Sequence, residues 1–371
     1  MRRRFDLVTL DPRGTGRSQP LSCASVVKTS DPAPSDQASL QALAGTRGTR
    51  WGSCIGASHG LAAHMDTASG ARDVEAIRRV LGEPRISALG VSYGTLTAQA
   101  YAERYGDRLR ALVLTSVVDH TRNKGAEAAE EGRNADELFG YFASWAATNS
   151  LSALHGQDAK TILLNLLRHA DATPIPAGKA QPVGGDEIRG LIIQTAYSNE
   201  YRWPNFTTRI AQAAAGNATG LREMLSEGGV IDQSDSAVWA TFCADWPVIS
   251  DRYDAIVHTL GRAAHAGPVM AGPHLDVATA VSCQGWPLPL AYPPHRLHVR
   301  QGPPALLVNP RYDPATAHSG AQRVASQLPH SVLLTVDGAA HAVLEGGCQI
   351  HISRYLIDGK LPDPHASCPL R

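Results

Sequence analysis

The sequence predicts an α/β fold in which a parallel sheet with flanking helices is interrupted by a long helical insertion. Short apolar strands alternate with helices near both ends of the chain, and this alternation is typical of one parallel sheet. Between about residues 120 and 300 the pattern changes to helices with breaks rich in Trp and Pro. The 371 residues suit a large domain that carries an inserted one. We therefore expect a first core part over 1–119, a helical cap over 120–300 and a second core part over 301–371.

The core elements are expected from their apolar periodicity and from the residues that end them. Continuous apolar runs indicate buried parallel strands, and apolar residues on one face indicate helices. Gly82 and Pro84 end one such helix, and Gly106 ends another. Residues 19–66 look irregular, since Pro, Ser and Gly are scattered through them. The expected strands are 5–10, 86–89, 109–118, 304–308 and 331–336, and the expected helices are 71–81, 95–105, 316–328 and 348–357.

The composition excludes several classes of function. Lys and Arg together number 34, as do Asp and Glu, so the formal net charge is zero and no basic field favours nucleic acid. The sequence has no apolar run of about eighteen residues, so we expect no membrane-spanning helix. His295 and His298 are not at the spacing of a metal-binding helix, and no other metal motif is found. We therefore expect neither a metal nor another cofactor.

Six cysteines fall in three sequence neighbourhoods, and none of them forms a CxxC motif. Their even number and local grouping favour disulfides, and with them an oxidising compartment, over a zinc or redox site. Six unrelated buried thiols are the alternative, and six cysteines allow about 15 pairings. The pairs that we predict are Cys23–Cys54, Cys243–Cys283 and Cys348–Cys368.

A tight turn between an expected strand and an expected helix carries the strongest chemical signal. It reads Gly90-Val-Ser-Tyr-Gly94, the G-x-S-x-G pattern of the nucleophile elbow of α/β-hydrolases. In such a turn Ser92 adopts a strained conformation that lifts its Oγ above the sheet. The backbone N–H of Tyr93 would face the oxyanion that develops during the reaction. The pattern alone is common by chance, but its strand–turn–helix context favours a catalytic serine.

A serine nucleophile needs a base and an acid that orients the base, and in this fold they follow in the order Ser, acid, His. Asp313 comes just after the strand expected at 304–308, and His341 just after the strand at 331–336. Both lie on loops at the carboxyl ends of strands, where such sheets bind ligands. The alternatives are that Asp313 is only an acid at a helix N-terminus, and that His341 is one of fifteen histidines that happens to fall in a loop.

Several motifs beyond the elbow are specific enough to suggest a family. They are Asp11-Pro-Arg-Gly-Thr-Gly-Arg-Ser18, Tyr101-Ala-Glu-Arg-Tyr105, Leu109-Arg-Ala-Leu-Val-Leu114, Cys243-Ala-Asp245 and Cys283-Gln-Gly-Trp-Pro287. With the triad loops, they make nearly all of the chain resemble the tripeptidyl aminopeptidase family, which is related to the prolyl iminopeptidases. The resemblance implies secreted or cell-envelope exopeptidases that remove short peptides from a free N-terminus. It also implies that Ser92, Asp313 and His341 form the triad and that residues 120–300 form a cap.

The chain departs from this family at its N-terminus. The family has a signal peptide and an upstream His-Gly-x-Pro-Gly-like loop, whereas here Met1 leads almost at once into the strand expected at 5–10. We therefore expect that the N-terminal portion is lacking, and with it a strand next to 86–89 and a second oxyanion donor. Unpaired strand backbone and a lost donor would leave these 371 residues alone nearly inactive and poorly soluble.

A substrate with a free N-terminal amine needs a carboxylate near the cavity. We expect Asp245 to bind it, since a bond between Cys243 and Cys283 would hold this cap segment in place. A structural hydrogen-bonding role for Asp245 is the alternative. The acids between residues 127 and 137 are expected to form a solvated helix face. The full set of candidates is Glu127, Glu130, Glu131, Asp136, Glu200 and Asp245.

The sequence therefore predicts a serine hydrolase that works through a Ser-Asp-His triad and an acyl-enzyme, with peptides as substrates. An esterase or amidase acting on small acyl groups would use the same triad, and the cap would decide between the two. The third interpretation belongs to a different functional class: the chain would be a truncated remnant without catalytic activity. The missing upstream loop favours this interpretation.

Overall fold

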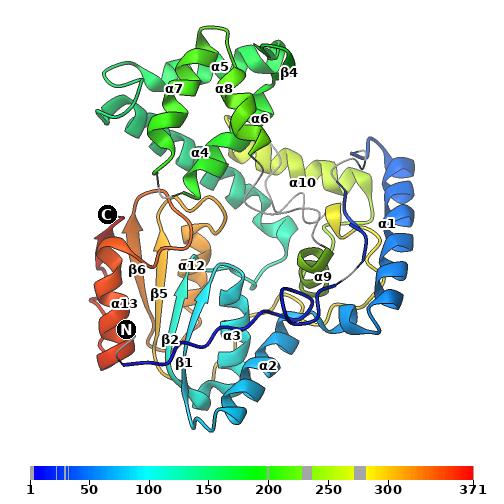
Figure 1. Ribbon diagram of the computed structural model, residues 1–371, viewed down its shortest axis with the longest axis vertical. Coiled ribbons are helices and arrows are strands. Elements are labelled where there is room, and N and C mark those ends of the chain that lie inside the picture. The colour runs from blue at the N-terminus through cyan, green and yellow to red at the C-terminus, as the bar shows by residue number, and fades with distance from the viewer. Residues whose placement is uncertain are drawn as a thin grey trace.

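The computed structural model describes residues 4–21, 23–28, 31, 33–198, 200–227, 236–270 and 281–370. Its central element is a sheet with the strand order β1-β2-β5-β6-β7, in which all neighbouring strands are parallel (Figure 1). The predicted α/β class is therefore confirmed. The strands are β1 (Ile86–Val91), β2 (Leu109–Thr115), β5 (Ala305–Pro310), β6 (Val332–Asp337) and β7 (Ser367–Pro369).

Helices cover both faces of this sheet. Leu112 and Leu114 of β2 are buried in the hydrophobic cluster on one face, whereas Ala111 and Val113 are buried in the cluster on the other. Because both faces are covered, β2 and β5 are almost continuously apolar, as parallel strands require. The helices are α2 (Thr67–Val80), α3 (Gly94–Tyr105) and α12 (His318–Ala325) on the first face and α13 (Gln349–Asp358) on the second.

The chain between β2 and β5 is mostly helical, as expected, although the domain boundaries at 119 and 300 stay a prediction. In Figure 1, α5 to α8 form a lobe at the top, and α10 lies on the right beside α1. Helix α4 packs against both α5 and α10 and so connects the two groups. The helices are α4 (Lys124–Thr148), α5 (Ala159–Ala172), α6 (Gly185–Ala196), α7 (Trp203–Ala214), α8 (Thr219–Ser226), α9 (Ser236–Asp245) and α10 (Tyr253–Ala266).

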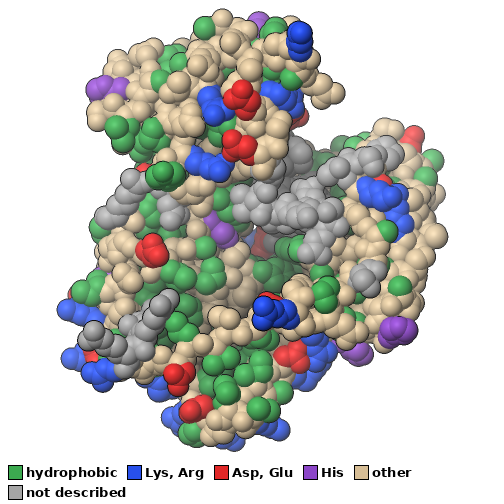
Figure 2. All heavy atoms as spheres, in the orientation of Figure 1, with side chains coloured by type: hydrophobic (Ala, Val, Ile, Leu, Met, Phe, Trp, Pro, Cys, Tyr) green, Lys and Arg blue, Asp and Glu red, His purple; other side chains and the backbone are tan. Residues whose placement is uncertain are grey.

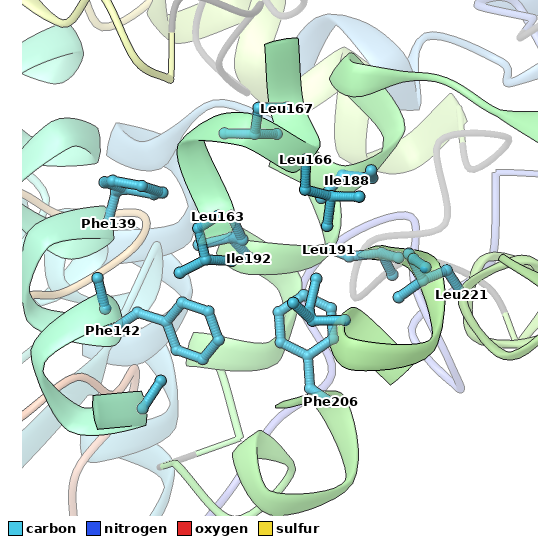
Figure 3. Packing of buried hydrophobic residues seen from close by; sticks show 14 of the residues in the cluster. Phe139, Phe142, Leu163, Leu166, Leu167, Ile188, Leu191, Ile192, Phe206 and Leu221 are labelled. Atoms are coloured by element: carbon cyan, nitrogen blue, oxygen red, sulfur yellow. The ribbon is translucent and has the colours of Figure 1, made fainter. Parts of the chain in front are cut away.

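The upper lobe has a hydrophobic core of its own. Phe139 and Phe142 of α4 face Leu163 of α5 and Ile192 of α6, and Phe206 of α7 closes the cluster (Figure 3). A short antiparallel hairpin that has no clear signal in the sequence adds two strands at the edge of this lobe. They are β3 (Ile175–Ala177) and β4 (Ala180–Val183).

Two expectations for the N-terminal residues are wrong. Residues 5–10 form no strand, and Leu7 and Val8 in this segment are 67% and 55% exposed. An apolar run becomes a strand only where a neighbouring strand pairs with it, and β1 pairs only with β2 within the described sheet. Residues 19–66, which look irregular, contain the long helix α1 (Gln37–Ala57). Its buried positions follow helical spacing, but one of them is Arg47, and the helix also contains several glycines, which are poor helix formers.

The three predicted disulfides are confirmed. They link the segment before α1 to α1, α9 to the segment that precedes β5, and the start of α13 to β7. The bonds are Cys23–Cys54, Cys243–Cys283 and Cys348–Cys368. No helix in the described part of the chain is both long and apolar enough to cross a membrane.

Candidate active site

Ser92 lies in the turn between β1 and α3. Its φ is +52°, in the left-handed region that few residues other than glycine adopt, and its N–H donates to the carbonyl of Thr115 at 3.0 Å. A Cβ on Gly90 would lie only 2.9 Å from Thr95 Cα, so glycine is needed for α3 to begin this close to β1. The local geometry is that of a nucleophile elbow, in which the strained turn presents the serine above the sheet.

His341 lies beside Ser92, and Asp313 lies on the far side of the imidazole ring. The Nε2 atom of His341 is 2.8 Å from Ser92 Oγ, and its Nδ1 atom is 2.9 Å from Asp313 Oδ1 and 3.1 Å from Oδ2. The Asp313 side chain is fully buried, and that of His341 is 10% exposed. The structure thus brings the three candidate residues together from the loops that follow β1, β5 and β6.

Further hydrogen bonds hold the loops of the acid and the histidine. Asp313 Oδ1 accepts the N–H groups of Ala315 and Thr316 at 2.9 and 2.8 Å, which fixes the orientation of the carboxylate. Ser116 Oγ accepts the N–H of Ala342 at 2.7 Å, and both of these residues have a positive φ, 51° and 64°. Strain of this kind collects at functional sites, where the surroundings hold it. No sequence motif marked Ser116, because it meets the histidine loop only in the folded chain.

The inserted segment also contacts the loops of the triad. Asn134 Nδ2 donates to the backbone carbonyl of Asp313 at 2.9 Å. The ring of Tyr197 lies 4.9 Å from the ring of His341, measured between centroids. An isolated Asn on a helix carries no signal in a sequence, so only the tertiary structure could identify Asn134 as a neighbour of the site.

A cavity of about 560 Å³ is lined by Ser92 and His341, a size typical of small-ligand pockets. In Figure 2 the surface is hollowed between the upper lobe and the part of the molecule that carries α1. Helix α9 and the residue just after it supply an apolar wall, and α4 supplies a polar one. The apolar wall contains Ala237, Val238, Phe242 and Trp246, and the polar wall contains Glu127, Glu130, Glu131 and Asn134.

Three of the acids expected on a solvated face of α4 line the cavity instead, whereas Glu137 is exposed as expected. Glu127 is only 5% exposed, Glu130 and Glu131 are half-buried, and all three line the cavity. The reason is the packing of α4, which lies against α10 on another side and turns this face inward. Glu130 accepts hydrogen bonds from Arg323 at 2.8 Å and from Arg122 at 3.2 Å, which partly neutralise it. Glu127 and Glu131 are separated by one helical turn and therefore lie on the same face.

Asp245 lies behind the cavity wall, not on it. Its side chain is fully buried, and it accepts hydrogen bonds from the N–H of Thr67 at 3.1 Å, from Thr67 Oγ1 at 2.7 Å and from the hydroxyl of Tyr93 at 2.6 Å. Burial raises the pKa of Asp245 to about 7, although the bonds from Tyr93 and Thr67 act in the opposite direction. Asp245 is absent from the described residues that line the cavity. The geometry therefore does not support the expected contact between Asp245 and a substrate amine.

The two remaining acidic candidates also have partners within the protein. Asp136 accepts two backbone N–H groups of the segment after α10, at 3.2 and 2.8 Å. Glu200 accepts the hydroxyl of Tyr141 at 2.9 Å and the N–H of Ala339 at 3.1 Å. Neither carboxylate belongs to the described lining of the cavity, so both act within the fold.

Comparison with known proteins connects this geometry to a family. A family model described as "TAP-like protein" matches residues 267–368, a segment that contains both Asp313 and His341. "Serine protease Hip1" of Mycobacterium tuberculosis (strain ATCC 25618 / H37Rv) is 29% identical, over 98% of this chain and 75% of its own length. "Tripeptidyl aminopeptidase" of Streptomyces lividans is 29% identical, over 98% of this chain and 70% of its own length.

Other relatives carry different names. "Carboxylesterase B" of Mycobacterium tuberculosis (strain CDC 1551 / Oshkosh) is 27% identical, over 99% of this chain and 74% of its own length. Among solved structures, an "Alpha/beta hydrolase fold protein from Nakamurella multipartita" shares 18% identity, with a TM-score of 0.30 over 81% of this chain and 72% of that one.

Proposed function

We propose that this serine hydrolase is an exopeptidase of the TAP-like family of α/β-hydrolases and that it releases short peptides from a free N-terminus. The observation that carries the proposal is the hydrogen-bonded series of Ser92, His341 and Asp313 at a cavity with an acidic wall. The names of two kinds of relative, a serine protease and a tripeptidyl aminopeptidase, support a peptide substrate.

In the proposed reaction, Ser92 Oγ attacks the carbonyl carbon of the scissile peptide bond while His341 Nε2 takes the hydroxyl proton. Asp313 holds the ring so that Nε2 faces the serine, and it stabilises the imidazolium that forms. The C–N bond then breaks as His341 gives its proton to the leaving amine, and the N-terminal peptide remains as an ester on Ser92. Water, with its proton taken by His341, hydrolyses this ester and restores the hydroxyl.

The tetrahedral intermediate of each step carries a negatively charged oxygen. Tyr93 stands at the N-terminus of α3 with helical φ and ψ of −56° and −30°. We propose that its backbone N–H donates to that oxygen, assisted by the positive end of the helix dipole. One donor of this kind is worth about 10²–10³ in rate.

The charge of the cavity wall favours a cationic substrate group. The described lining contains five acidic residues and two arginines. Asp119 and Glu130 are paired with Arg323, and Asp66 caps α2 by accepting the N–H of Ser69. The acidic residues are Asp66, Asp119, Glu127, Glu130 and Glu131, and the arginines are Arg13 and Arg323.

We propose that Glu127 and Glu131, instead of Asp245, receive the N-terminal ammonium of the substrate. Both carboxylates lie on the face of α4 that lines the cavity, one helical turn apart, so an ammonium that enters the cavity can contact both of them. A charge-assisted hydrogen bond to an ammonium has a net value of about 1.5–3 kcal/mol. Binding of the amine at this wall would place the N-terminal end of the substrate inside the cavity.

The test compares a tripeptidyl anilide that has a free amine with its N-acetylated form. The wild-type chain should strongly prefer the free amine. Glu127→Gln and Glu131→Gln should each raise KM for the free-amine substrate about tenfold, with little effect on the acetylated one. Glu137→Gln is the matched control, because this exposed acid lies on the same helix outside the cavity lining. Equal cleavage of both substrates by the wild-type chain would contradict the exopeptidase assignment.

An esterase acting on small acyl groups is the alternative, and the relative named "Carboxylesterase B" is the observation in its favour. The same triad and acyl-enzyme would serve, but the acidic wall would have no role. A short-chain p-nitrophenyl ester measured beside the free-amine anilide decides between the two. An esterase should hydrolyse the ester efficiently, leave the peptide intact and tolerate Glu127→Gln.

The three disulfides bear on the compartment in which the chain works. Disulfides persist in secreted proteins and in the cell envelope, and are rare in the cytosol. We propose that the chain functions in such an oxidising compartment. Peptide mapping without reduction, on protein isolated from its natural source, should recover the three linked peptide pairs. Free thiols at these positions would contradict the proposal.

A further inference from the structure

We propose that Asp245 is a positioning residue that, through the hydroxyl of Tyr93, fixes the turn of Ser92 against the cap helix that walls the cavity. The inference rests on the proposed function, because it concerns the same nucleophile. It assigns a role to a buried carboxylate that the acyl-transfer steps do not use.

Asp245 connects two parts of the site that are far apart in the sequence. It is the last residue of α9, the helix that presents Val238 and Phe242 to the cavity. Tyr93 directly follows the nucleophile, and its hydroxyl donates to Asp245 Oδ2 at 2.6 Å. The ring of Tyr93 also packs on Phe242, with centroids 4.8 Å apart. One side chain of the elbow therefore contacts α9 at two points.

A third element meets the same carboxylate. Thr67, the first residue of α2, donates to Asp245 through its N–H and its hydroxyl. The backbone carbonyl of Asp245 lies 3.1 Å from His120 Nε2, in the segment after β2. None of the ion pairs found among the described residues involves Asp245, so its side-chain charge is balanced by hydrogen-bond donors inside the fold. Burial raises the pKa of Tyr93 well above its usual value, so the phenol stays protonated and remains a donor.

This contact matters because the elbow is strained. A positive φ at a serine persists only where the surrounding structure holds it. The N–H of Ser92 is fixed on one side by Thr115, and the side chain of Tyr93 anchors the other side. Without that anchor, the ring and the backbone N–H of Tyr93 can shift, and a displacement of about 1 Å at a reacting group can lower the rate roughly 10²-fold. The disulfide at Cys243, two residues before Asp245, limits movement of α9.

The test uses two substitutions at Asp245 and one at Tyr93. Tyr93→Phe removes only the hydroxyl and keeps the ring on Phe242. It should lower both kcat and the rate of labelling by a fluorophosphonate about tenfold or more, with KM changed less than about twofold. Asp245→Ala should show the same pattern. Asp245→Asn retains an acceptor oxygen of the same shape and should recover most of the lost kcat.

Tyr101→Phe is the matched control. Tyr101 lies on the helix that follows the elbow, it is buried, and its hydroxyl donates to Glu75 at 3.0 Å. This substitution removes the same kind of bond outside the cavity lining, so it should lower the thermal midpoint and leave kcat unchanged.

Four outcomes decide the inference. A kcat drop in Tyr93→Phe that Tyr101→Phe does not share, and that Asp245→Asn largely avoids, supports it. A wild-type kcat in Tyr93→Phe, or a loss in Asp245→Ala that disappears once the folded fraction is counted, overturns it. A wild-type chain that no fluorophosphonate labels would instead overturn the proposed function, and this inference with it.

Discussion

Tyr141 of α4 stacks on Tyr312, the residue before the acid of the triad, with ring centroids 4.3 Å apart and ring planes inclined by 16°. The hydroxyl of Tyr141 donates to Glu200, which also accepts the N–H of Ala339 in the loop of the triad histidine. Tyr141 therefore contacts the loop of the triad acid, and Glu200 contacts the loop of the triad histidine. The geometry of the site is therefore coupled to the packing of the upper lobe.

We expect Glu200→Ala to lower kcat/KM about tenfold, because the hydroxyl of Tyr141 and the N–H of Ala339 lose their acceptor. A buried donor left without a partner costs about 1–3 kcal/mol. Glu200→Gln keeps an acceptor oxygen and should retain most of the activity. Steady-state kinetics beside thermal denaturation measure both effects, and Glu227→Ala, which removes a half-exposed acid of the same lobe, is the control. Unchanged kinetics in Glu200→Ala would show that the loops do not depend on the cap.

Asp313→Asn should reduce kcat by about 10⁴-fold while the fold stays intact. The reason is that an amide at this position favours the wrong tautomer of His341, so that Nε2 no longer accepts the proton of Ser92. His365→Ala, in an exposed turn, serves as the control among the histidines. Measurement of kcat with the free-amine anilide tests this, and a loss of less than about tenfold would argue against Asp313 as the orienting acid.

Asp245 should make stability depend on pH. Its pKa is raised to about 7 in the folded chain, so the folded state binds the proton more tightly than the unfolded state does. The free energy of unfolding should therefore fall by up to a few kcal/mol as the pH rises from about 4 to about 7, and this contribution should stay constant above that range. Urea unfolding across this range measures the slope.

Asp245→Asn should remove that part of the slope. The other groups that face Asp245 are Asp66, Tyr93 and His120, and the substitution leaves all three in place. The difference between the two unfolding curves therefore isolates the one carboxylate. Parallel curves for the wild-type and substituted chains would contradict the raised pKa.

Replacing Cys243 and Cys283 together with serine should lower the free energy of unfolding by roughly 3–4 kcal/mol, since the bond closes a loop of 40 residues. The Cys348–Cys368 bond closes a loop of 20 residues, so its removal should cost slightly less by the same chain-entropy argument. Chemical denaturation of the two double variants measures both. The reverse order would show that strain or residual structure in the unfolded chain outweighs loop entropy.

The parts of the fold that the sequence predicted are those that have a local signature. The strands at 86–89 and 331–336 are predicted by continuous apolar runs. The helices between them are predicted by apolar residues that recur on one helix face. The strand expected at 5–10 failed because its apolar residues have no paired strand, a condition that no local pattern reveals. Helix α1 is not predicted because its buried stripe contains a charged residue, Arg47, and its sequence contains several glycines.

The residues of the candidate site also fall into two groups, those with a local signature in the sequence and those without one. Ser92, Asp313 and His341 sit in loops with recognisable neighbours, so each could be proposed from its surroundings in the chain. The roles of the acids depend on tertiary packing. The sequence predicts a solvated position for Glu127, but the packing of α4 against α10 turns this residue inward. The sequence also suggests Asp245 as an amine anchor, but in the fold its carboxylate is bound by residues of α2 and of the elbow.

The central claim is that Ser92 carries the acyl group, and one labelling measurement tests it most directly. The chain is treated with a fluorophosphonate, digested, and the modified residue located by mass spectrometry. The proposed mechanism predicts a single adduct on Ser92, with none on the Ser92→Ala chain, because only this hydroxyl lies within hydrogen-bonding distance of His341 Nε2 in the described structure. Labelling that persists at another residue in Ser92→Ala, or an adduct elsewhere in the wild-type chain, would contradict it.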